Sequence, residues 1–232
     1  MILITFALPH ESGRFLPKLE DKHWIQRGAL PLLTGSFEGR QISVLHTGVG
    51  PERARSSCEV FLTQHQPELL IAAGYAGGLD GRLATGDLIL AENFTDPSLL
   101  ALAREVSDGK AFPGQLTTQS QVAETAGAKK KLAKDTGAIA VDMETEAIYK
   151  QALLFKVPML SVRAISDPVG TAMPIPVNIW FDAINQKPRV IPLLTHLAIN
   201  PSKIPAFASF VRGTSLARNE LTRFLVGFLK RH

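Results

Sequence analysis

Short apolar runs rich in β-branched residues recur along the first 165 residues and constrain the fold more than any other feature of the chain. Runs of about four to eight such residues are typical of buried strands. The segments between several of them carry helix signals, such as Pro51 at a first helical position and Gly137 at a helix end. Because strands that alternate with helices build a mainly parallel sheet covered on both faces, the pattern predicts an α/β fold. The predicted strands are residues 2–8, 42–46, 69–73, 88–91, 138–141 and 159–165, and the predicted helices are 51–64, 121–136 and 143–155.

The last third of the chain differs, because prolines recur from Pro168 to Pro205. We expect loops and short helices there, followed by a helix over residues 216–229. Its apolar positions fall roughly on one face, so it should pack on its own domain or on a subunit partner. Contact of this basic amphipathic helix with a membrane surface is an alternative that we do not expect. The prediction is a single domain over 1–232, with a catalytic core over 1–170 and a helical, proline-punctuated extension over 171–232.

Composition excludes several classes of protein. A chain of 232 residues that is 45% hydrophobic and 20% charged can bury a sizeable core. The net charge of +4 is mild and the basic residues are dispersed, so we do not expect nucleic acid as a partner. The lone Cys58 excludes an internal disulfide and suits a cytoplasmic protein. The apolar N-terminus lacks the basic start of a signal peptide, and no run is long enough to span a membrane.

Acidic residues stand at three points where a site could form. Glu11 follows the first predicted strand and Asp167 follows the last, and ligands of open α/β sheets bind beyond such carboxyl ends. Glu144 shares a helical face with apolar residues, which points its carboxylate inward, whereas Glu146 has the spacing of an exposed ion pair with Lys150. Three acids on one rim would suit glycosidic-bond cleavage, in which one acid protonates the leaving group and another activates water.

Each of these residues also has a structural explanation. Asp167 would suit an Asx turn before a proline, and Glu11 the first turn of a short helix over 12–19. Asp142 is expected to cap the helix that follows it. Arg163, inside an apolar strand, needs either a buried acid or a ligand as its partner. The glycine cluster over 74–78 is explained as well by a tight turn as by a pocket.

Three motifs resemble the nucleoside phosphorylase/nucleosidase superfamily, and in particular the methylthioadenosine/S-adenosylhomocysteine nucleosidases. The first motif is Val-Asp-Met-Glu over residues 141–144 together with Arg-Ala-Ile-Ser-Asp over residues 163–167. The second is the glycine-rich segment over residues 73–79, followed by Gly86 and Asp87. The third is Glu11, the acidic residue that follows residues 7–10. The resemblance covers about residues 1–170. It implies a three-layer α/β fold around a central mixed, partly barrel-like sheet.

The resemblance also implies roles for the three acids. Asp167 would protonate N7 of a purine, Glu144 would hold the ribose hydroxyls and stabilise a cationic sugar, and Glu11 would position or deprotonate the attacking water. These roles agree with the physical requirement that a cationic sugar has a carboxylate nearby and a leaving base has a protonated acid. The substrate-binding residues implied are Met143, Gly74, Tyr75, Ala76, Gly77, Val122 and Ser166. No metal or organic cofactor is implied, and a homodimer is expected.

Some residues depart from the nucleosidase pattern. Tyr75 stands where those enzymes usually have a small hydroxyl residue, and the linker between Asp87 and Thr118 is shorter. The proline-punctuated tail instead resembles the hopanoid-associated phosphorylase branch, which is implicated in releasing adenine from an adenosylated lipid. That likeness would make the enzyme a phosphorylase with phosphate as co-substrate.

The nucleophile is therefore open between water and phosphate. A phosphorylase needs fixed cationic groups for the phosphate. Arg53 and Arg55 could supply them, although exposed helix arginines are the more ordinary explanation. We expect hydrolysis that releases adenine from a 5′-substituted adenosine such as methylthioadenosine or S-adenosylhomocysteine. A non-catalytic nucleoside-binding protein on the same fold is the alternative from another class.

Overall fold

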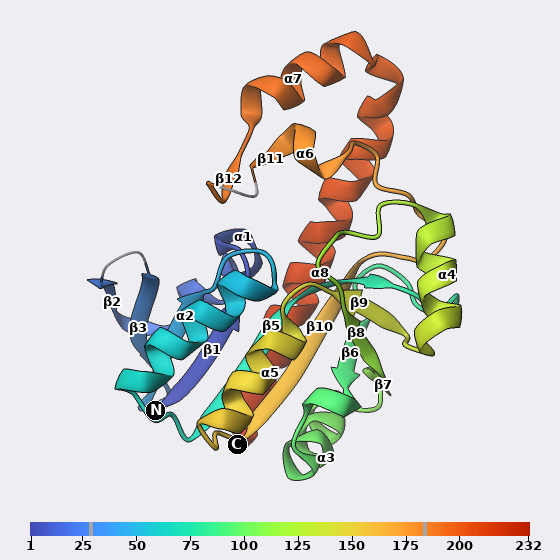
Figure 1. Ribbon diagram of the computed structural model, residues 1–232. Coiled ribbons are helices and arrows are strands. Elements are labelled where there is room, and N and C mark those ends of the chain that lie inside the picture. The colour runs from blue at the N-terminus through green and yellow to red at the C-terminus, as the bar shows by residue number, and fades with distance from the viewer. Residues whose placement is uncertain (28–29, 183–184) are drawn as a thin grey trace.

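A ten-stranded mixed sheet forms the centre of the protein in a computed structural model that describes residues 1–27, 30–182 and 185–232. The main path of the sheet runs β2-β3-β4-β1-β5-β10-β6-β7, and β9 joins β8 to the end of β5 (Figure 1). Its strands are β1 (Ile2–Phe6), β2 (Glu20–Arg27), β3 (Leu30–Phe37), β4 (Arg40–His46), β5 (Leu69–Gly78), β6 (Leu88–Ala91), β7 (Phe112–Gly114), β8 (Leu116–Thr118), β9 (Ala140–Asp142) and β10 (Met159–Asp167).

Helices cover both faces of this sheet. The described helices are α1 (Pro9–Ser12), α2 (Pro51–Gln64), α3 (Pro97–Val106), α4 (Ala126–Thr136), α5 (Thr145–Leu154), α6 (Val177–Trp180), α7 (Val190–Ile199) and α8 (Ile204–Arg231), of which α3 and α8 pack on one face and α2 and α5 on the other. Three 3₁₀ turns, η1 (Leu16–Lys18), η2 (Glu92–Phe94) and η3 (Pro201–Lys203), and the short hairpin of β11 (Phe181–Asp182) and β12 (Lys187–Pro188) complete the described elements.

The four central strands β4, β1, β5 and β10 are parallel, whereas β3 and β6 flank them in the antiparallel sense. Their carboxyl ends therefore meet at one edge of the sheet, where ligands of open α/β sheets bind. At that edge the sheet branches, because Gly77 and Gly78 of β5 pair with β9 as well as lying beside β10. The mixed α/β fold predicted from the sequence is confirmed.

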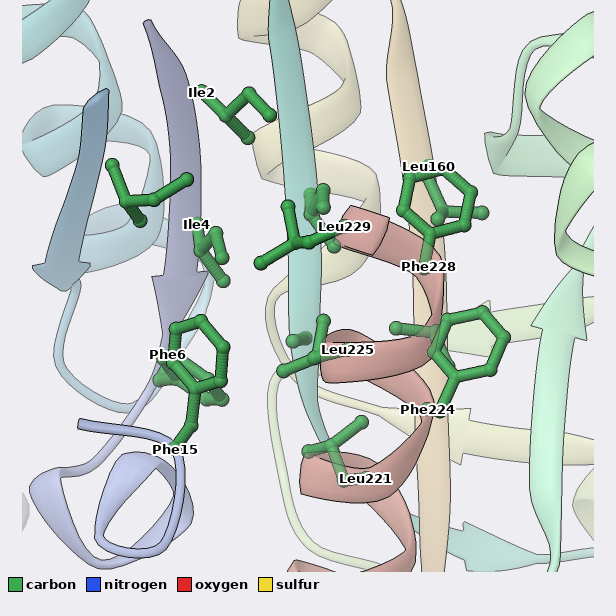
Figure 2. Close-up of a cluster of buried hydrophobic side chains, with 14 of the residues drawn as sticks. Ile2, Ile4, Phe6, Phe15, Leu160, Leu221, Phe224, Leu225, Phe228 and Leu229 are labelled. Atoms are coloured by element: carbon green, nitrogen blue, oxygen red, sulfur yellow. The ribbon is translucent and has the colours of Figure 1, made fainter. Parts of the chain in front are cut away.

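Alternating residues of the central strands build two cores, one on each face of the sheet. Leu3 faces α2 and α5, whereas its neighbours Ile2 and Ile4 face α8. Figure 2 shows Leu221, Phe224, Leu225, Phe228 and Leu229 of α8 packed opposite Ile2, Ile4, Phe6 and Leu160. The period of two along each buried strand thus produces the three layers.

The C-terminal helix belongs to this core. The stripe predicted on residues 216–229 is buried at all positions except Leu216, which is 45% exposed. The helix packs on its own sheet, which is one of the two placements expected for it from the sequence. Among the described residues, no helix combines the length and apolar character needed to cross a membrane.

Several expected boundaries were wrong. The hairpin of β2 and β3 and helix α3 were not predicted, and α4 begins at Ala126, where Thr125 caps it, rather than at residue 121. The helix expected over 12–19 is instead the short α1 followed by η1. In the C-terminal third, α7 spans ten residues and α8 begins at Ile204, twelve residues before the predicted start.

Candidate active site

A cavity of about 370 Å³ lies at the carboxyl ends of the central strands. Glu11, Glu144 and Asp167 all line it, although they come from three separate parts of the chain. Each of the three carboxyl groups is almost completely buried. Buried carboxyl groups are costly unless they are paired, hydrogen-bonded or used in chemistry, so the partners of each one indicate what it can do.

Glu11 follows the first strand, and two backbone N–H groups hold its carboxyl group, one just after β1 and one on β5. The N–H of Leu8 donates to its Oε2 at 2.8 Å, and the N–H of Tyr75 donates to its Oε1 at 2.9 Å. Burial raises the pKa of Glu11, against the opposing effects of these backbone hydrogen bonds and the charge of Arg163. A carboxyl group with a raised pKa, fixed in orientation beside a cavity, suits proton transfer with water.

Glu144 is the N-cap residue of α5, not an internal helix residue as predicted, but its carboxyl group does point inward. The N–H of Gly50 donates to Oε1 of Glu144 at 2.8 Å. Gly50 has a φ of 100°, a conformation that L-amino acids with a side chain rarely adopt, and this turn aims its N–H at the carboxylate. Burial, followed by the nearby charge of Asp142, raises the pKa of Glu144 to about 8.

Arg163 has a buried acid as its partner, which is one of the two explanations predicted for it. Its Nη2 lies 2.9 Å from Oδ2 of Asp142, and its Nε and Nη2 donate to Oγ1 of Thr145 at 3.1 and 2.7 Å. Asp142 also accepts from the backbone N–H of Thr145 at 3.0 Å, so its carboxylate caps α5 as predicted, although it lies two residues before the formal N-cap. This cluster fixes the start of α5 and thereby the position of Glu144.

Gly74 belongs to the support of the site and not to the described cavity lining, contrary to the sequence prediction. A Cβ atom at this position would lie 2.2 Å from Nη1 of Arg163 and 3.0 Å from Oε1 of Glu11. Arg163 is fully buried and paired, so it cannot move away. Gly74 is therefore required because two buried charged groups approach the backbone of β5.

Asp167 lies at the end of β10, just past an irregularity in the pairing with β5. Such bulges re-aim a side chain at the end of a strand. Oγ of Ser166 donates to its Oδ1 at 2.5 Å, and its Oδ2 forms an ion pair with Nζ of Lys129. Lys129 also donates to the carbonyl oxygens of Asp167, Pro168 and Thr171, at 3.2, 3.0 and 3.1 Å.

The other candidates divide into two groups. Six of the predicted binding residues line the cavity beside the three acids; they are Met143, Tyr75, Ala76, Gly77, Val122 and Ser166. The two proposed phosphate ligands, Arg53 and Arg55, are exposed on α2 outside the described lining. Arg55 pairs there with Glu52 and Glu59, at 3.4 and 2.8 Å, and Glu146 pairs with Lys150 at 2.6 Å. Arg55 is thus a surface helix residue, which corrects its assignment as a phosphate ligand.

Comparison with known families agrees with this geometry. A family model described as "Phosphorylase superfamily" matches residues 1–115 and 92–180. The chain belongs to the phosphorylase superfamily. This confirms the resemblance that the motifs at 141–144 and 163–167 indicate.

Superfamily relatives of known activity include nucleosidases. The 5′-methylthioadenosine/S-adenosylhomocysteine nucleosidase of Staphylococcus epidermidis is 25% identical over 196 residues, which span 72% of this chain and 86% of the relative. The S-adenosylhomocysteine nucleosidase of Streptococcus pyogenes superposes with a TM-score of 0.77 at 19% identity, covering 99% of this chain and 96% of the other. The futalosine hydrolase of Helicobacter pylori also gives 0.77 at 19% identity, covering 100% and 97%. These two structures share the fold.

The superfamily motifs do not contain every residue of the site. Lys129 was not among the residues predicted from the sequence. Its position offered one signal, because Leu132 and Ala133 follow it by three and four residues and therefore place it on the apolar face of α4. The aromatic wall of the cavity, formed by Trp180, Phe207 and Phe210, was also missed. No sequence motif joins these aromatic residues to the acids, since they come from the C-terminal third of the chain.

Proposed function

We propose that the protein hydrolyses the N-glycosidic bond of a 5′-substituted adenosine and releases adenine. The observation that carries this proposal is the presence of Glu11, Glu144 and Asp167 in one cavity at the carboxyl edge of the sheet. The chemistry requires an acid for the leaving base, a negative charge near the sugar and a group that activates water, and three carboxyl groups can meet these requirements.

Asp167 transfers a proton to N7 of the purine in this proposal, and the ammonium group of Lys129, which is paired with its Oδ2, supplies that proton. Its Oδ1 is oriented by Ser166 and its Oδ2 by Lys129, so the carboxyl group is fixed at the wall of the cavity. Glu144, with the backbone of Met143, binds the ribose hydroxyls. Its pKa of about 8 keeps it mostly protonated in the free site, and the positive charge that develops on the sugar favours its ionised form, which stabilises that charge. Glu11 holds the attacking water and accepts its proton, and Tyr75 shares the adjoining wall.

Water is the nucleophile rather than phosphate, because the cavity offers little to an inorganic anion. The basic side chains among the described lining residues are those of His10 and Lys129. Burial, with the nearby charge of Arg218, lowers the pKa of His10, which favours its neutral form. Lys129 is already engaged by Asp167 and three carbonyl oxygens. A phosphorylase needs cationic donors that are available to the phosphate.

The far wall of the cavity supports an apolar group at the 5′ carbon of the sugar. Trp180, Phe207, Phe210 and Val211 line it, and they carry no charge that would favour a phosphorylated substrate. Methylthioadenosine and S-adenosylhomocysteine are the substrates we propose to test first. No metal or organic cofactor enters the proposed chemistry. We further propose that the enzyme is cytoplasmic and forms a homodimer, which sedimentation equilibrium would test.

Release of the purine base from a panel of nucleosides tests the proposal. The panel comprises methylthioadenosine, S-adenosylhomocysteine, futalosine, adenosine and inosine, each with and without phosphate. We expect release of the base at the same rate in both conditions, with a free reducing sugar as the second product. A phosphate-dependent rate with a sugar 1-phosphate would replace hydrolysis by phosphorolysis. Tight nucleoside binding without any base release would instead indicate a binding protein.

A further inference from the structure

Helix α7 is apolar apart from Thr195 and His196, yet none of its residues is buried. Ile191, Leu194 and Ile199 are 78%, 60% and 73% exposed, and Ile204 at the start of α8 is 48% exposed. Figure 1 shows α7 standing apart from the three layers, at the end of the molecule opposite both termini. Contiguous exposed apolar side chains are normally covered by protein or lipid, so this surface lacks a partner in the monomer. At ten residues α7 is too short to span a bilayer.

The charges around α7 are mostly positive, with Asp182 as the acid that lies opposite Lys187 in the hairpin of β11 and β12. Residues 183–219 contain five Lys and Arg and no Asp or Glu, although the whole chain is nearly balanced. Lys187, Arg189, Lys203 and Arg212 are exposed and flank the apolar residues on both sides. An apolar face bordered by basic residues is the composition of helices that lie in the interface of anionic membranes.

We propose that α7, with η3 and the first turn of α8, docks on the surface of an anionic lipid bilayer. A second copy of the chain could cover the same surface instead. In a two-fold dimer, however, the α7 surface of one copy would pack against the α7 surface of the other. The excess positive charge of one copy would then face that of the other, which is unfavourable. A bilayer with anionic headgroups covers the apolar residues and compensates the basic ones.

The docking surface continues into the cavity. Phe207, Phe210 and Val211 on the first half of α8 line the far wall, and Trp180 precedes the hairpin that leads into α7. Docking therefore places the apolar wall of the cavity next to lipid, whichever nucleoside the enzyme cleaves. This surface differs from the predicted amphipathic helix over 216–229, whose apolar stripe is buried against the sheet.

Cosedimentation with vesicles tests the proposal on the full chain. We expect binding to vesicles of phosphatidylcholine and phosphatidylglycerol in equal parts, weakened by salt, and little binding to phosphatidylcholine alone. The double variant Ile191→Glu/Leu194→Glu should lose at least about tenfold in affinity, because it places two carboxylates in the apolar face. The matched control is Leu153→Glu/Leu154→Glu, which replaces two leucines of α5 that are 59% and 68% exposed. It should bind as the wild type does.

Two results would overturn the proposal. One is equal affinity of the wild type and the α7 double variant for the anionic vesicles. The other is no binding of the wild type to the anionic vesicles, and a wild-type dimer that the α7 double variant converts to monomer would then make a second copy the occupant. Circular dichroism checks that both variants are folded, and base release is measured in parallel because it does not depend on docking for a water-soluble substrate.

Discussion

Nζ of Lys129 forms an ion pair with Oδ2 of Asp167 at the wall of the cavity, and both side chains are almost fully buried. The two residues are 38 positions apart and come from the first turns of α4 and the last position of β10. Three backbone carbonyl oxygens complete the coordination of the ammonium group. The pair therefore joins the proposed acid to the helix that precedes β9 and fixes the orientation of its carboxyl group.

Replacing Lys129 by Met should lower the free energy of unfolding by about 3–5 kcal/mol, because it leaves the Asp167 carboxylate buried without a compensating charge. Urea denaturation at neutral pH measures this loss. The double variant Lys129→Met/Asp167→Asn removes the orphaned charge and should recover part of the stability without recovering base release. If the double variant were no more stable than Lys129→Met alone, the pair would not be the source of the loss.

Asp167→Asn should lower kcat for purine release by about two to four orders of magnitude, since the amide cannot protonate N7. Lys129 keeps its three carbonyl acceptors in this variant, so the protein should still fold. Steady-state assays on methylthioadenosine below the melting temperature of the variant measure the effect. Thr63→Ala, at an exposed position on α2 outside the described cavity lining, is the control and should retain wild-type kcat. Activity of Asp167→Asn within a few-fold of wild type would remove Asp167 from the mechanism.

Local sequence patterns predicted the elements that position the acids but not the contacts between them. The bounds of α2 and β6 were predicted as observed, because a proline start and a compact apolar run are signals within a few residues. The short helices expected in the last third are present, but its prolines misled the prediction of where the last helix begins. Pro205 lies in the first turn of α8 and Pro192 in that of α7, where the missing N–H has no helical partner to lose.

Contacts between distant residues were beyond the reach of such patterns. The motif resemblance indicated Glu11, Glu144 and Asp167, and all three line the cavity. Lys129 carried only a weak signal, an apolar helix face, because its partner lies on another strand. Gly74 leaves room for the side chain of Arg163 because the two residues lie opposite each other in the pairing of β5 with β10. Local sequence patterns do not predict that register.

The buried carboxyl of Glu144 should make stability fall as pH rises. Its pKa is raised from 4.5 to about 8 by burial, so the folded protein binds more protons than the unfolded chain between those values. The free energy of unfolding therefore decreases with pH over that window. The cost of ionising the buried carboxyl group is fully present above about pH 8. Glu144→Gln keeps an acceptor for the Gly50 N–H and carries no charge. Its free energy of unfolding relative to wild type should therefore increase between pH 5 and pH 9, as denaturant titrations at both values would measure. A constant difference would contradict the raised pKa.

Gly74→Ala should disturb both stability and activity, because its Cβ would overlap Nη1 of Arg163 and press on Oε1 of Glu11. Overpacking of this kind costs about 1–3 kcal/mol, and the displaced carboxyl of Glu11 should lower kcat as well. Gly81→Ala is the matched control, since nothing lies within 4 Å of the added methyl group there. Thermal denaturation and base-release assays on both variants separate the two effects. The assignment of Glu11 requires that kcat of Gly74→Ala falls even at temperatures where the variant is fully folded, whereas Gly81→Ala stays at the wild-type value.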